Sequence, residues 1–238
     1  NMYNTAVGAA AGQKVTTGIL NTLIGGLAGD AMTDADENVA VGYNALTANL
    51  KGNRTVAIGT GALMAQTFPT ITDSYNTAVG HFAGGSVTTG IRNTIMGGQA
   101  GDALTDADYN VAVGALALTS DTLGSKSTAI GRGALKTQNF TTATNSYNTA
   151  LGYSAGTAVT TGDKNTLIGT LSGDAITTGS NNTLVGYGTE PSAVDAGSQI
   201  VMGKGTIGVG DSTFTFGKDN GSDRVHNTFT SNATFTRV

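Results

Sequence analysis

The chain has 238 residues, of which 36 are glycine and 2 are proline, and it contains neither cysteine nor tryptophan. Without cysteine it can form no disulfide framework and no thiolate metal site. The formal net charge is −4 and the basic residues form no run, which argues against nucleic acid as a partner. No apolar run approaches the roughly 20 residues that span a bilayer, which argues against membrane insertion.

A five-residue phrase, Asn-Thr-Ala-Val-Gly and its close variants, recurs twelve times. Successive copies follow a 17-residue period, interrupted by two 21-residue steps. A short fixed period is typical of a solenoid, in which each repeat packs only against its neighbours. We therefore predict an all-β chain, a parallel β-solenoid (β-roll or β-helix) of about twelve 17-residue rungs. The phrases end at Gly8, Gly25, Gly42, Gly59, Gly80, Gly97, Gly114, Gly131, Gly152, Gly169, Gly186 and Gly203.

A longer period is nested in the first. Gly8, Gly80 and Gly152 mark a 72-residue period, so four rungs and a four-residue insert form a larger unit. Three such units, the last incomplete, make up a predicted solenoid shaft over residues 1–205. The super-repeats are residues 1–72, 73–144 and 145–205.

The residues before each terminal glycine predict a strand that is apolar on both faces. In the first copy these residues are Thr5, Ala6 and Val7. The first position is β-branched in every copy, and the second and third are always apolar. Alternate residues of a strand point to opposite faces, and a strand that is apolar on both faces is buried on both. A 17-residue coil has only one interior, so we predict that another copy of the chain covers the second face, in a homotrimer.

Asparagine opens the phrase in nine of the twelve rungs, beginning with Asn4, Asn21 and Asn38. Stacked amides can form a ladder along the axis of a stacked-strand structure. We therefore predict that these asparagines are structural and bind no ligand. The third residue after the glycine is small in nearly every rung, as at Ala11 and Ala28, which predicts close backbone approach inside the coil.

The regular pattern breaks in two kinds of place. The 21-residue steps contain the inserts 66–70 and 138–142, which we predict to protrude, with Phe68 and Phe140 packed back onto the rod. After the twelfth phrase the period is lost and short Thr-Phe-Thr alternations begin, which are typical of strands with one apolar face. We predict a separate C-terminal β element over residues 206–238.

The phrase Asn-Thr-Ala-Val-Gly-x-x-Ala-Gly, with Asn-Thr-Leu-Ile-Gly, resembles the head repeats of trimeric autotransporter adhesins of the YadA type. It resembles more closely the repeats of tail fibres and other appendages of bacteriophages and algal viruses. The resemblance covers residues 1–203. The last seven residues, Asn-Ala-Thr-Phe-Thr-Arg-Val, look like the stretch that precedes an endosialidase-type intramolecular chaperone, which trimerises a fibre and then cleaves itself off. This resemblance implies the mature product of such a fibre, a trimeric parallel β-roll or β-helix.

The resemblance also implies a function, a location and partners. The chain would be a structural trimeric fibre on the extracellular face of a virion that mediates attachment to the host cell. Its partners would be two further copies of itself, the virion baseplate or other fibre proteins, and a host-surface receptor such as a glycan. The alternative is the head of a trimeric adhesin on a bacterial cell surface.

A third class is a spike that depolymerises glycans. Glycan hydrolysis uses a pair of carboxylates across one groove, whereas the regular rungs offer mostly threonine and asparagine. We therefore predict that the chain is not an enzyme, and we expect no cofactor.

An acidic segment recurs in the first two super-repeats. Oxygen-rich clusters can hold Ca²⁺, but the spacing matches neither an EF-hand nor the calcium-binding β-roll repeat. In the third super-repeat threonine and serine replace two of the three aspartates. The pattern favours solvated acidic turns over a metal site. The six weak candidates are Asp30, Asp34, Asp36, Asp102, Asp106 and Asp108.

Aromatic residues are the better binding candidates. Tyr43, Phe82 and Tyr153 lie just after the strand glycine, where most other rungs carry small or polar residues, and an exposed ring offers an apolar face to a sugar. A surface with a 72-residue period presents no unique pocket, so we expect recognition at the non-repeating end, by weak contacts multiplied threefold. The candidate residues there are Phe214, Phe216, Phe229 and Phe235.

Overall fold

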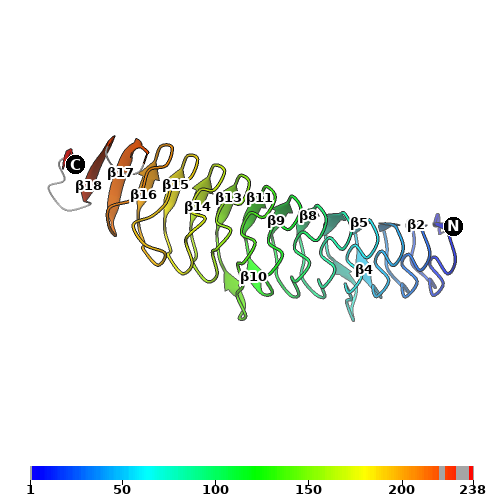
Figure 1. Cartoon of the computed structure of the whole chain (residues 1–238). Coiled ribbons are helices and arrows are strands. Elements are labelled where there is room, and N and C mark those ends of the chain that lie inside the picture. Colours follow the sequence, from blue (N-terminus) through cyan, green and yellow to red (C-terminus); the bar gives the residue numbers. More distant parts are fainter. Residues whose placement is uncertain (1, 220–222, 229–235, 238) are drawn as a thin grey trace.

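The computed structural model describes residues 2–219, 223–228 and 236–237, and these residues form an elongated rod with strands but no helix (Figure 1). Twelve three-residue strands follow one another along the rod, one for each phrase, and confirm the predicted parallel β-solenoid. They are β1 (Thr5–Val7), β2 (Thr22–Ile24), β3 (Val39–Val41), β5 (Val56–Ile58), β7 (Thr77–Val79), β8 (Thr94–Met96), β9 (Val111–Val113), β11 (Thr128–Ile130), β13 (Thr149–Leu151), β14 (Thr166–Ile168), β15 (Thr183–Val185) and β16 (Ile200–Met202).

Equivalent residues of neighbouring rungs pair with each other. Thr5 of β1 lies opposite Thr22 of β2, and Thr22 lies opposite Val39 of β3, in parallel register. The same register continues through β16, so the strands form one long sheet on one side of the rod. A 17-residue period places the same type of side chain at the same point of every rung.

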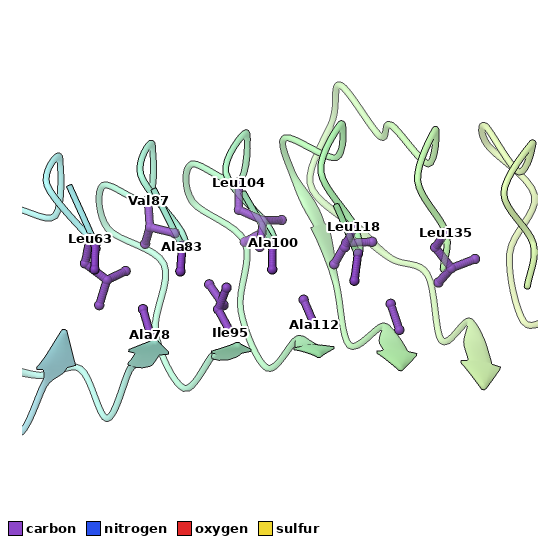
Figure 2. Packing of buried hydrophobic residues seen from close by; sticks show 14 of the residues in the cluster. Leu63, Ala78, Ala83, Val87, Ile95, Ala100, Leu104, Ala112, Leu118 and Leu135 are labelled. Carbon is purple, nitrogen blue, oxygen red and sulfur yellow. The ribbon is translucent and has the colours of Figure 1, made fainter. Parts of the chain in front are cut away.

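The core lies between this sheet and a layer of turns. The middle residue of nearly every strand points inward, as Ala78, Ile95 and Ala112 do in Figure 2, and meets side chains from the turns. The alanine three residues after the strand glycine is also buried from Ala28 to Ala155. The small residues at this position therefore lie in the interior of the coil.

Two kinds of rung alternate in pairs. Where the fourth residue after the strand glycine is glycine, as at Gly29, a large apolar side chain such as Met32 follows three residues later and fills the core. A Cβ on Gly29 would lie 2.9 Å from the Met32 sulfur. Where the fourth residue is leucine, as at Leu46, the leucine itself fills the core and the later residue is polar, as at Asn49. In both arrangements the side chain that fills the core is fully buried.

The asparagine ladder is present, and most of its hydrogen bonds join an asparagine side chain to a backbone group. The buried side chain of Asn110 accepts the backbone N–H of Ser127 on the next rung (2.8 Å) and donates to the carbonyl of Gly124 (2.9 Å). Direct amide-to-amide bonds also occur, for example from Asn38 to Asn21 (3.1 Å). Each such asparagine side chain therefore links its own rung to backbone groups of the next rung.

The inserts restore this ladder where the asparagine is missing. Thr55 stands in the asparagine column, and Gln66 from the insert donates to its hydroxyl (3.0 Å) and accepts from Asn76 (2.8 Å). Phe68 and Phe140 are buried, as predicted. Each insert protrudes from the rod (Figure 1), and the residues that follow it form a short parallel pair with the preceding rung: β6 (Thr72–Asp73) with β4 (Gly52–Asn53), and β12 (Thr144–Asn145) with β10 (Gly124–Ser125).

The sheet continues beyond the last regular rung. Strand β17 (Thr213–Lys218) pairs in parallel with β16, so hydrogen bonding is continuous across the sequence boundary at residue 206. Strand β18 (Asp223–Thr228) then pairs antiparallel with β17, and β19 (Thr236–Arg237) pairs antiparallel with β18. The direction of pairing changes between β17 and β18.

Candidate functional site

An apolar stripe runs along the outward face of the sheet. It consists of the last residue of each phrase strand, and we call it the outer stripe. Many of its side chains are exposed, from 36% at Ile168 to 58% at Val7, and the others are half-buried. Contiguous apolar surface of this extent marks an interaction site. The outer stripe is Val7, Ile24, Val41, Ile58, Val79, Met96, Val113, Ile130, Leu151, Ile168, Val185 and Met202.

A column of charged and aromatic side chains, which we call the corner column, lies two residues before the first residue of the phrase strands, at the opposite end of each strand from the outer stripe. Its residues stand five positions before the strand glycines, where the backbone adopts a positive φ, as at Tyr109 (58°). From the third to the tenth rung the column alternates cations and tyrosines after a first glutamate. Its members are Glu37, Arg54, Tyr75, Arg92, Tyr109, Lys126, Tyr147 and Lys164.

Each of three cations in the corner column lies over the tyrosine ring of the next rung. The distances from cation to ring centroid are 5.6 Å for Arg54 and Tyr75, and 5.3 Å for Arg92 and Tyr109. The third pair is Lys126 and Tyr147, also at 5.3 Å. These are cation–π distances. Motif reasoning missed the corner column, although alignment of the rungs on their glycines places these residues in one line.

The aromatic residues proposed from the sequence do not form one site. Tyr43, Phe82 and Tyr153 are all exposed. Tyr43 and Tyr153 occupy equivalent positions six rungs apart, which is roughly 29 Å at the spacing of neighbouring strands. Tyr153 pairs with Arg132 at 5.7 Å, while Phe82 contacts His81 edge-on at 4.5 Å.

The C-terminal candidates are placed only in part. Phe216 is exposed on β17, in line with the outer stripe, and its register partner on β16 is Met202. Phe214 is half-buried on the same strand. Phe229 and Phe235 lie outside the described residues.

The candidate aspartates accept hydrogen bonds at separate corners of the rod. Asp36 accepts the backbone N–H of Ile19 (2.8 Å), and Asp108 accepts that of Ile91 at the same distance. The others accept threonine hydroxyl groups one rung away: Asp30 from Thr47, Asp34 from Thr17, Asp102 from Thr119 and Asp106 from Thr89. Within the described ranges, no three His, Asp or Glu side chains gather closely enough to hold a metal ion.

Asp34 has the most partners of these aspartates. The Thr17 hydroxyl donates to it at 2.6 Å, and Lys51 forms an ion pair with it at 3.4 Å. The hydrogen bond from Thr17 is the main cause that lowers the pKa of Asp34, with help from Lys51. The carboxylate therefore stays ionised and ties one rung to the next.

A half-buried carboxyl pair lies near the end of the solenoid. Glu190 accepts the backbone N–H groups of Asp174 (3.0 Å) and Ala175 (3.3 Å). Burial, and after it the neighbouring Asp174 carboxyl, raise the pKa of Glu190 to about 8. The folded chain thus holds this proton more tightly than the unfolded chain does. The stability that Glu190 contributes is fully present below pH 4.5 and is lost as the pH rises through about 8.

We expect Glu190→Gln to improve in stability relative to the wild type as the pH rises. The amide carries no charge, so it avoids the loss that ionisation of Glu190 imposes. Because the side chain is partly solvated, we expect a relative gain of about 2 kcal/mol between about pH 5 and about pH 9, less than the full shift implies. Urea unfolding at both pH values measures it. Glu37→Gln, at an exposed glutamate, is the control, and an equal gain there would contradict the assignment.

Comparison with known protein families, curated proteins and solved structures finds no match. No helix in the part of the chain that the structure describes could cross a membrane.

Proposed function

We propose that this chain is the shaft of a homotrimeric viral fibre, a phage tail fibre or related appendage, that mediates attachment to the host cell. The observation that carries the proposal is the outer stripe, an unbroken apolar line along the outward face of the sheet. The stripe runs the full length of the rod, so its partner must be long as well.

A second copy of the chain fits this requirement best. Any copy has the same distance between rungs, so every row of the stripe can meet an equivalent row. Cyclic symmetry about an axis parallel to the rod places the copies side by side at the same height. The face of the phrase strands is about 53 Å long, since eleven steps of about 4.8 Å separate the first strand from the last. An interface along this face can therefore extend over the whole row of strands.

We expect acidic substitutions in the outer stripe to separate the copies. Val113→Asp with Ile130→Asp places two carboxylates in the proposed apolar interface, where burying a charge is costly. Light scattering should give three times the 23.7 kDa of one chain for the wild type and a single chain for the double variant.

The matched control places two aspartates in and next to the second protruding insert, at the exposed residues Thr141 and Ala143. This insert lies on the opposite side of the rod from the phrase strands (Figure 1). Thr141→Asp with Ala143→Asp should remain trimeric. A wild-type mass of one chain would refute the homotrimer.

Attachment is assigned to the C-terminal part of the chain, because its surface occurs once per copy. The exposed Phe216 extends the outer stripe there. The test uses unlabelled competitors against fluorescent full-length protein on bacterial cells that bind it. Full-length chain should compete, and residues 1–205 alone should not. If residues 1–205 compete as well as the full-length chain, the shaft carries the recognition surface. If neither protein competes, the chain is only a spacer.

A further inference from the structure

The middle of the corner column combines three exposed rings with two cations. The side chains of Tyr75, Tyr109 and Tyr147 are 48%, 45% and 50% exposed, so solvent reaches about half of each residue. Arg92 and Lys126 lie between them along the rod and are exposed as well. The five residues follow one another on five consecutive rungs.

The spacing of the rings is regular. Successive tyrosines lie two rungs apart, which is roughly 9.6 Å at the spacing of neighbouring strands. That is about the length of two linked sugar rings in an extended β-linked polysaccharide. A glycan chain lying along the rod would therefore pass one tyrosine at every second sugar. The cation of the preceding rung lies over one face of each ring, so the C–H face of the sugar would contact the opposite face.

The charges of the column point to the kind of glycan. Arg54 is already paired with Glu37 and Asp73, and Lys164 with Asp163. Among the residues that the structure describes, Arg92 and Lys126 have no carboxylate within 4.0 Å. Two unneutralised cations thus stand between the three rings, on a chain whose net charge is −4.

We infer that the corner column from Tyr75 to Tyr147 binds an extended acidic polysaccharide with one carboxylate per disaccharide. The tyrosines stack on alternate sugars, and Arg92 and Lys126 pair with the carboxylates between them. This site goes beyond the proposed function, because it lies on the shaft and requires neither the C-terminal element nor a viral origin.

The alternative is that the cation–π pairs of the column are purely structural. Exposed cation–π pairs stabilise contacts between rungs by about 0.5–1 kcal/mol each. On that reading, loss of the pairs lowers stability slightly and changes no binding. Arg132 and Tyr153 form a similar pair away from the column and supply the comparison.

The test measures binding of the full-length chain to immobilised glycans by biolayer interferometry. Hyaluronan, chondroitin and heparosan carry the required alternating carboxylate. Chitin oligosaccharides are the neutral control, and polyglutamate is a polyanion without sugar. Two variants alter the column: the single substitution Tyr109→Asn, and the double substitution Arg92→Gln with Lys126→Gln. Asparagine already occupies the equivalent corner at Asn181. Arg132→Gln and Tyr187→Thr are matched controls, since Thr170 is the natural equivalent of Tyr187.

We expect at least one acidic glycan to bind, and both column variants to weaken it by about tenfold or more, equivalent to about 1.4 kcal/mol. The matched controls should bind as the wild type does, and added salt should weaken binding. Absence of binding to all three glycans, equal binding of chitin or polyglutamate, or unchanged binding by the column variants would overturn the inference. Light scattering of each variant separates these outcomes from failure of the homotrimer.

Discussion

Gly97→Ala is expected to destabilise the rod by about 3 kcal/mol or more. Gly97 ends the β8 phrase with φ of 133°, which L side chains rarely adopt. A Cβ there would lie 2.6 Å from the carbonyl carbon of Gly114 and 2.9 Å from the backbone nitrogen of Ala115. These are backbone atoms of the next rung, so they cannot move aside without breaking the strand register. Urea unfolding followed by circular dichroism measures the loss.

The neighbouring residue provides the control. Gly98 has an ordinary φ, and a Cβ placed there would meet nothing within 4 Å. Gly98→Ala should therefore change the free energy of unfolding by no more than about 0.5 kcal/mol. A similar loss at both positions would show that the contact with Gly114 is not the cause.

Asn110→Ala is expected to cost about 2–6 kcal/mol of unfolding free energy. The substitution removes the acceptor for the Ser127 N–H and the donor to the Gly124 carbonyl, in a place closed to water. Each group left unpaired costs about 1–3 kcal/mol. The same unfolding measurement tests this value.

An exposed asparagine serves as the comparison. Asn145 on β12 is exposed, and Asn145→Ala should be close to neutral. If Asn110→Ala is equally mild, water must reach the ladder and replace the lost bonds. The ladder would then contribute little to the stability of the rod.

The sequence was sufficient to predict the strands and their register. Three residues before each glycine the chain is β-branched, and the structure places a strand on these residues in all twelve rungs. The prediction succeeded because the period forces equivalent residues to stack. Burial of Phe68 and Phe140 was also predictable, since no other apolar residue of their inserts could fill the space between insert and rod.

The contacts between columns were harder to predict. Gln66 meets Thr55 and Asn76 only because the coil brings residues 10 and 11 positions apart to one corner. The direction of the asparagine bonds depends on backbone groups, which carry no sequence signal.

The candidate binding site was predicted less well than the fold. The chosen aromatics, Tyr43, Phe82 and Tyr153, were selected rung by rung and lie on different rungs, too far apart to act together. The corner column depends on alternation between rungs, for example of Arg92 and Tyr109, which occupy the same position of neighbouring rungs. Such a pattern emerges only when side chains are compared along the axis.

The ladder of Asn110 and its equivalents has a mechanical consequence. The bonds that join one rung to the next run along the axis of the rod, so a pull on its two ends loads them in series. A rung that detaches releases a 17-residue segment, which extends to roughly 58 Å in place of the roughly 4.8 Å that the rung occupied. The rungs therefore resist tension one by one. A rung that detaches becomes more than ten times as long as it was when folded, while the remaining rungs stay folded.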